Sequence, residues 1–336
     1  MTDSATPAMD VETFRKIAHD IETEVGRVMV AQNDLVRMVL ICVLANGHAL
    51  IEGVPGLGKT RLVRTLADVL DVRFSRIQFT PDLMPADITG TNILVEDERG
   101  RRSFNFQHGP VFANFVLADE INRATPKTQA ALLEAMQDRT VTIASTQHQL
   151  PNPFFVLATQ NPLEMEGTYP LPEAQLDRFM FKLIVPYPSA TELAEILQRT
   201  TSAYEQQVQT VADGQRISAM THLAAQTPVA KHLMDYVVRL TLATHPESPM
   251  APQSVRDYVQ VGVSPRGGQS IIVGARIRAL MENRLNVAME DIQDVARHAL
   301  RHRLLLNFNA LADRVTADAI LDRLLAELPE SAMVPA

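Results

Sequence analysis

Cysteine pairs, long apolar runs and blocks of like charge are missing from this sequence. Its 336 residues hold a single cysteine, Cys42, which excludes an internal disulfide framework and fits a reducing compartment. The longest apolar run, Met38 to Ala45, is too short to span a bilayer. The N-terminal stretch is rich in Asp and Glu, so no secretory signal is expected. Together these absences predict a soluble cytoplasmic protein.

The charge balance bears on the kind of partner. The formal net charge is -8 at pH 7, and no block of like charges stands out. Proteins held mainly by the phosphate backbone of nucleic acid present a basic surface, so we expect no nucleic-acid partner. Hydrophobic residues make up 46% of the chain, which is enough for a packed core. A chain of this length typically forms about two domains.

Short apolar runs alternate with helical patterns over residues 25–187, which predicts an α/β fold with a parallel sheet and helices on both faces. Two insertions, near residues 93–106 and 140–150, have hairpin signals and are candidate contact elements. After residue 187 the pattern becomes helical, so residues 188–330 are predicted to form a smaller all-helical domain. Residues 1–24 are predicted to be an N-terminal helical extension. The expected strands are residues 48–52, 74–79, 112–118, 154–159 and 179–185.

A glycine-rich turn follows the first expected strand. Residues 53–60 match G-x-x-x-x-G-K-[ST], a loop whose backbone N–H groups cradle phosphates. Lys59 is expected to reach the β and γ phosphates, and Thr60 to bind Mg²⁺. A plain strand-to-helix turn is the structural alternative. The residues expected to surround the nucleotide are Gly53, Pro55, Gly56, Leu57, Gly58, Lys59, Thr60 and Arg61.

An acidic pair and an asparagine follow two other apolar strands. Asp119 is placed to bind Mg²⁺ and Glu120 to deprotonate a water, because strand ends of such sheets face one crevice. Asn161 is placed to hold the attacking water. The structural alternative for Asp119 and Glu120 is an acidic pair that precedes a helix. The structural alternative for Asn161 is a residue of an Asn-Pro turn. No lysine follows an asparagine, so the guanine-reading Asn-Lys-x-Asp is absent and adenine is favoured.

Three arginines are candidates to complete the site. Arg178 is expected to reach the γ phosphate of a neighbouring subunit as an arginine finger, unless it pairs with a nearby carboxylate. Arg266 lies in the first turn of an expected helix, where its charge opposes the helix dipole unless an anion is near. We expect that anion to be a phosphate, with the second domain folded over it; a solvated arginine is the alternative. Arg123 is a further candidate for a subunit interface.

This ordered set resembles the AAA+ ATPases, and more narrowly the MoxR group. In that resemblance the phosphate loop is Walker A, the acidic pair is Walker B, Asn161 is sensor 1, Arg178 is the arginine finger and Arg266 is sensor 2. The hairpins correspond to the helix-2 insert and the pre-sensor-1 hairpin. The segments that carry it include GHALIEGVPGLGKT (47–60), QFTPDLMPADITG (78–90) and VSPRGG (263–268).

The resemblance implies an ATPase that binds ATP or ADP with Mg²⁺ and assembles as a homo-oligomeric ring, usually a hexamer. It also implies a chaperone-like role in remodelling or maturing protein complexes, often with a partner that carries a von Willebrand factor A domain and its metal site. Two positions depart from the family pattern. Ala31 stands where glycine is more common, next to the adenine side of the site, and Thr125 replaces a common proline.

Three other functions remain open at this point. The chain could be a DNA-acting motor of the same superfamily, a nucleotide switch without turnover, or a chelatase-type motor subunit. The sequence does not name the client protein, and it does not decide between Arg123 and Arg178 as the residue that acts in trans.

Overall fold

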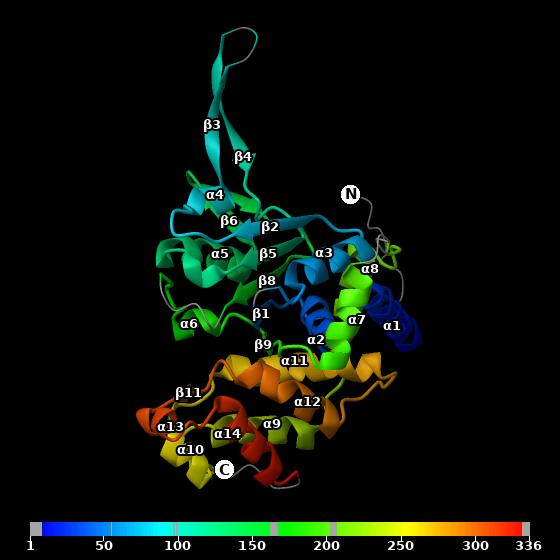
Figure 1. Cartoon of the computed structure of the whole chain (residues 1–336), viewed down its shortest axis with the longest axis vertical. Helices are drawn as coiled ribbons and strands as arrows, with labels where there is room; N and C mark the ends of the chain where they lie inside the picture. Colours follow the sequence, from blue (N-terminus) through cyan, green and yellow to red (C-terminus); the bar gives the residue numbers. More distant parts are fainter. Residues whose placement is uncertain are drawn as a thin grey trace.

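The molecule has three parts along its long axis: a projecting hairpin, a sheet with flanking helices, and a helical domain at the opposite end from the hairpin (Figure 1). The structure is a computed structural model. It describes residues 9–54, 56–96, 98, 100–161, 167–201 and 207–330.

A five-stranded parallel sheet forms the centre, as predicted. Its order is β2-β5-β8-β1-β9, and every neighbouring pair is parallel. The strands are β1 (Ala49–Glu52), β2 (Phe74–Gln78), β5 (Phe115–Asp119), β8 (Phe155–Gln160) and β9 (Phe181–Ile184).

Helices cover both faces of this sheet because alternate residues of its central strands point to opposite sides. Phe115 and Leu117 belong to one apolar core, together with α1 (Val11–Val28), α2 (Asn33–Leu44) and α3 (Lys59–Val69). Val116 and Ala118 belong to a second core with α5 (Pro126–Asp138). Nearly continuous apolar strands are therefore what this sheet requires.

Both expected hairpins are present. The first consists of β3 (Gly90–Glu96) and β4 (Arg102–His108), follows α4 (Pro85–Thr89), and is longer than the predicted 93–106. Its turn residues Asp97 and Arg99 lie outside the described residues. The second consists of β6 (Thr140–Ile143) and β7 (Thr146–Gln149).

The described part of the chain after the sheet contains helices and one short pair of strands. A short antiparallel pair, β10 (Val259–Val261) and β11 (Leu305–Leu306), interrupts the domain that was predicted to be all-helical. Strands of two or three residues are too short to leave a periodic signal in a sequence. The helices are α7 (Ala190–Thr200), α8 (Gly214–Gln226), α9 (Lys231–Ala243), α10 (Gln253–Tyr258), α11 (Pro265–Met281), α12 (Met289–Leu300), α13 (Phe308–Ala312) and α14 (Ala317–Glu327).

The helical domain packs against the edge of the sheet. Helix α12 contacts the edge strand β9, and α11 contacts both α1 and α2. Two short helical turns complete the chain, η1 (Ile121–Arg123) after β5 and α6 (Glu173–Leu176) before β9. Among the helices of the described residues, none has the length and apolar character needed to cross a bilayer.

Candidate functional site

The loop between β1 and α3 has the conformation that a phosphate cradle needs. Gly56 and Gly58 have φ of 87° and 78°, in the left-handed region where a side chain is disfavoured. Helix α3 begins at Lys59 with Gly58 as its N-cap, so its first backbone N–H groups are available to an anion. Pro55, also expected here, lies outside the described residues.

The loop opens onto a cavity of about 260 Å³, the phosphate-loop cleft. The structure brings most of the predicted site residues together in it. Asp119 arrives at the end of β5 and Asn161 just after β8, as expected for strand ends that share one edge of a parallel sheet. The cleft is lined by Gly56, Leu57, Gly58, Lys59, Thr60, Arg76, Gln78, Asp119, Glu120, Thr159 and Asn161.

Lys59 points back at its own loop. Its Nζ donates a hydrogen bond to the carbonyl oxygen of Gly53 at 2.7 Å. Burial lowers the pKa of Lys59, and the carboxylates of Asp119 and Glu120 oppose that shift. The predicted Arg61 is exposed on α3 and does not line the cleft.

The acidic pair is held by Thr159, a residue that the sequence analysis missed. The Thr159 hydroxyl donates to Asp119 Oδ1 at 2.7 Å and accepts from the backbone N–H of Glu120 at 2.8 Å. Glu120 has φ of 56°, a strained conformation for a residue with a side chain. One hydroxyl therefore orients both carboxylate-bearing residues, and a polar residue at the end of an apolar strand was the available signal.

Strand β2 supplies two more residues that were missed. Arg76 donates to Asp119 Oδ2 at 2.6 Å from Nη2 and 3.2 Å from Nε. Gln78 Nε2 donates to Glu120 Oε2 at 3.0 Å. Arg123 donates to the same Glu120 oxygen at 3.0 Å, so its side chain contacts the acidic pair of its own subunit. The register of β2 against β5 explains why Arg76 and Gln78 reach the acidic pair, because Gln78 lies opposite Asp119 in the sheet.

The oxygen donors of the cleft fit Mg²⁺. This ion prefers oxygen ligands and keeps several waters, so it takes few protein ligands beside phosphate oxygens. The Thr60 hydroxyl and the Asp119 carboxylate line the same cleft and are donors of that kind. For Asp119 to serve as a ligand, its ion pair with Arg76 must rearrange.

A larger cavity of about 960 Å³, the interdomain cavity, lies where the core meets the helical domain. Gln32 lines it and donates from Nε2 to the phosphate-loop carbonyl of Leu57 at 3.1 Å, so the cavity adjoins the loop. Ala31 has φ of 57°, which explains in physical terms why glycine suits this position. The helical domain contributes Arg278, Asp294, Arg297 and His298 to the lining.

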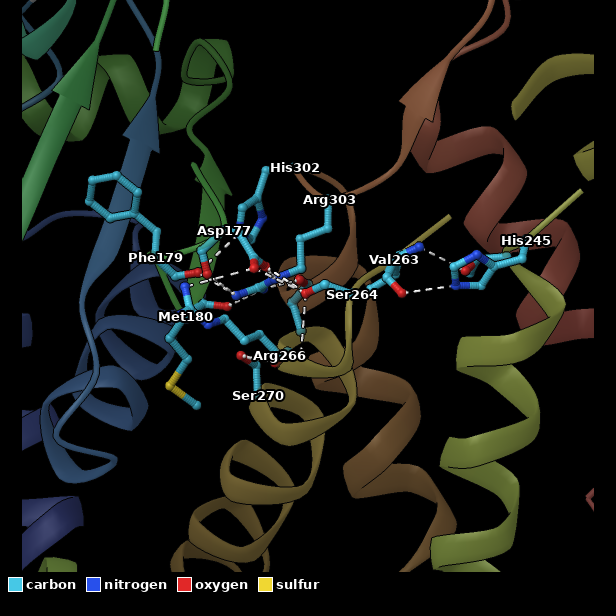
Figure 2. A network of polar contacts seen from close by, with 12 residues as sticks. Asp177, Phe179, Met180, His245, Val263, Ser264, Arg266, Ser270, His302 and Arg303 are labelled. Atoms are coloured by element: carbon cyan, nitrogen blue, oxygen red, sulfur yellow. Dashed lines mark hydrogen bonds and ion pairs between the residues drawn. The ribbon is translucent and has the colours of Figure 1, made fainter. Parts of the chain in front are cut away.

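Arg178 and Arg266 lie apart from the cleft. Both line a different cavity of about 260 Å³, the arginine cavity, together with Asp177 and Arg303. Figure 2 shows Arg266 beside Asp177 and Arg303. Arg266 lines this cavity and not the cleft, because α11 starts beside the Asp177 segment. Within the described residues the Arg178 guanidinium has no hydrogen bond or ion pair, so the expected alternative of a nearby carboxylate partner is not observed.

His48 lines the arginine cavity and connects three elements of the core. Its Nδ1 accepts from the backbone N–H of Val156 at 3.1 Å, so Nε2 carries the proton and donates to the carbonyl of Met136 at 3.0 Å. Burial lowers the pKa of His48 to about 4. The imidazole is therefore neutral at pH 7 and ties β1 to β8 and α5.

Comparison with known proteins matches two parts of the chain to family models. Residues 48–181 match the model of the ATPase family associated with various cellular activities (AAA), and residues 252–324 match the AAA lid domain. The chain is 44% identical to "Chaperone MoxR1" of Mycobacterium tuberculosis over 99% of its own length and 90% of that protein. It is 31% identical to "Protein MoxR" of Methylorubrum extorquens, over 87% and 89% of the two chains. A solved putative ATPase from Cytophaga hutchinsonii superposes with a TM-score of 0.88 at 38% identity, covering 97% of each chain.

Proposed function

The chain belongs to the MoxR family of AAA+ ATPases, and on this premise we propose that its phosphate-loop cleft binds ATP with Mg²⁺ and hydrolyses it. The observation that carries the proposal is the content of that cleft. Lys59, Thr60 and the acidic pair come from separate strand ends and converge on one cavity. Asn161 joins them and is 7% exposed.

Each group has a role in this proposal. The loop N–H groups and Lys59 bind the phosphates, while Thr60 and Asp119 hold Mg²⁺, which would neutralise charge on the phosphate oxygens. Glu120 takes a proton from the attacking water, and Asn161 orients that water. The interdomain cavity adjoins the loop and is lined by core and lid, so we assign the adenine and ribose to it.

Arg178 and Arg266 are proposed to act on a neighbouring subunit. They line a cavity that shares no residue with the cleft of their own chain, and Arg178 has no partner among the described residues. An interface of this head-to-tail kind closes into a ring when its rotation permits. We propose a homo-oligomeric ring, with a hexamer as the expected size.

For the biological role we propose chaperone-like remodelling of protein complexes. The support is the name of the relative called a chaperone, which shares nearly the whole chain. A partner with a von Willebrand factor A domain and a cytoplasmic location are part of the same proposal. The single cysteine, Cys42, is buried and unpaired, which fits a reducing compartment.

The test compares substitutions within the cleft. Lys59→Ala should abolish nucleotide binding in a fluorescent ATP titration. Glu120→Gln should keep binding and lower the turnover number by about 10²-fold or more, because a general base is removed. Glu134→Gln, which changes an exposed carboxylate on α5, is the matched control and should turn over normally. Normal turnover by Glu120→Gln would show that the base is wrongly assigned.

A further inference from the structure

Asp177 joins the core to the lid beside the cavity that both candidate trans-acting arginines line. It directly precedes Arg178, and its carboxylate oxygens accept from the Ser264 hydroxyl at 2.9 and 3.0 Å. Ser264 is the N-cap of α11, the helix that carries Arg266 in its first turn. A carboxylate of the core therefore holds the helix start that presents a lid arginine (Figure 2).

Arg303 binds the same carboxylate from the lid. Its side chain is 3% exposed, and its Nε donates to Asp177 Oδ1 at 2.6 Å. Nη2 donates to the carbonyls of Asp177 at 2.9 Å and Phe179 at 2.8 Å. Nη1 donates to the carbonyls of Met180 at 3.1 Å and Ala299 at 2.5 Å.

All five N–H groups of this guanidinium are thus used, and four of the five bonds reach across to the core segment beside Arg178. A lysine ammonium has three donors and no planar fork, so it could form at most three of these five bonds.

The first turn of α11 is packed tightly against this connection. A Cβ added to Gly267 would lie 2.2 Å from Val263 Cγ1, 2.9 Å from Leu300 Cδ2 and 3.3 Å from Arg303 Cδ. Only glycine lets the residue after Arg266 come so close to the end of α12 and to the Arg303 stem.

The chain before α11 is also held. The backbone N–H of Val263 donates to the Thr244 hydroxyl at 2.9 Å, and its carbonyl accepts from His245 Nε2 at 3.1 Å. The backbone that carries Arg266 is consequently anchored on one side to the two residues that follow α9, and on the other to the Asp177–Arg303 pair (Figure 2).

We propose that Arg303 is a positioning residue for the ATPase reaction. Through Asp177 it locks the Arg178 segment of the core to the Arg266 turn of the lid, so that one subunit presents both guanidinium groups to its neighbour as a unit. The proposal rests on the trans role of Arg178 stated above. In the part of the chain that the structure describes, the Asp177 carboxylate binds Arg303 and Ser264 and forms no ion pair with Arg178. Its Oδ2 is 3.8 Å from Nη1 of Arg266, a longer distance than the 2.6 Å between Oδ1 and Nε of Arg303.

The test uses rings co-assembled from two kinds of subunit. Receiver subunits carry Arg178→Ala and keep an intact cleft, whereas donor subunits carry Lys59→Ala and supply only their arginines. Neither kind alone should hydrolyse ATP appreciably, and co-assembly should restore turnover in the receiver clefts.

Donors that also carry Arg303→Lys should restore about tenfold less turnover, because a small misplacement of a reacting group is costly. The KM for ATP should stay unchanged, since the receiver cleft is intact. Donors with Arg301→Lys are the matched control. Arg301 is also a buried lid arginine, 7% exposed, but it pairs with Asp318 rather than Asp177, so these donors should restore turnover fully.

The outcomes separate this inference from the proposed function. Full turnover by receiver rings alone would refute the trans role of Arg178, and with it the premise of the inference. Inactive receivers whose turnover is restored as well by Arg303→Lys donors as by the parent donors would refute the inference alone.

If Arg303→Lys donors do not assemble, donors with Asp177→Asn test the same connection. This change keeps the side-chain shape and the Asp177 carbonyl but removes the carboxylate that joins Ser264 to Arg303. Impaired restoration by assembled rings would support the proposal, and full restoration would overturn it.

Discussion

The phosphate-loop cleft and the arginine cavity are built on opposite principles. The cleft collects side chains from neighbouring strand ends of one domain, and its two carboxylates pair with partly exposed groups such as Arg76 and Gln78. The arginine cavity spans two domains and depends on Arg303, which is buried and fully hydrogen-bonded. The first can rearrange around a ligand, whereas the second is suited to holding two arginines at a constant separation.

The largest expected difference concerns the arginine that lacks a partner. Arg178→Ala should lower turnover by about 10³-fold, the effect of losing an arginine finger, while ATP affinity and the melting temperature stay near those of the parent chain. The measurements are steady-state phosphate release, an ATP titration and a thermal melt. A variant that melts much earlier would make Arg178 a structural residue.

The buried arginine should show the reverse pattern. Arg303→Met leaves Asp177 in a half-buried site without its main cation, so we expect unfolding to become easier by about 3 kcal/mol. Arg178→Met, one residue from Asp177, should change the free energy of unfolding by less than about 0.5 kcal/mol. Urea unfolding of the two variants gives both values, and equal losses would remove the contrast between them.

Acid should act through histidines buried outside the cleft, at the arginine cavity and, with His298, at the interdomain cavity, because the described lining of the cleft has no histidine. Burial lowers the pKa of His48 to about 4 and that of His302, beside Arg303, well below its usual value. Between pH 6.5 and 4 the unfolded chain binds protons that the folded chain does not, so stability falls as the pH falls.

The shift at His48 corresponds to about 3 kcal/mol lost over that range. Urea midpoints measured from pH 7 to pH 5 should therefore decrease. His48→Gln, which keeps a donor and an acceptor but cannot titrate, should show a shallower decrease. An unchanged slope would mean that other groups account for the acid sensitivity.

The smallest predicted effect lies in the interdomain cavity, to which we assign the adenine. Ala31 has a left-handed backbone, so Ala31→Gly should stabilise the fold by up to about 1 kcal/mol. Ala45→Gly, at the end of a helix with φ of -77°, should instead destabilise it slightly. Thermal melts of both variants test the sign, and a loss of stability in Ala31→Gly would contradict the strain.

The two regions also differ in how much of each could be predicted from the sequence. The cleft could be predicted because its residues lie in short motifs at the ends of apolar strands, and strand ends of a parallel sheet meet. The residues that hold the acidic pair in place could not be predicted. Arg76, Gln78 and Thr159 contact the acidic pair only because of strand register, which no local pattern reveals.

The arginine cavity was predictable only in part. Arg178 and Arg266 were recognised by their motifs, but their placement in one cavity was not. Arg303 and Asp177 are far apart in the sequence, and their contact depends on how the lid docks on the sheet edge. Docking of this kind is decided by the packing of whole helices, as the close approach at Gly267 illustrates.

The central claim is that the cleft of one subunit is completed by arginines of the next. The most direct measurement is the rate of phosphate release from rings co-assembled from Lys59→Ala and Arg178→Ala subunits, compared with rings of either variant alone. We predict that both single-variant rings are nearly inactive and that the mixed rings regain turnover. Mixed rings no more active than their parents, or full activity in Arg178→Ala rings alone, would contradict it.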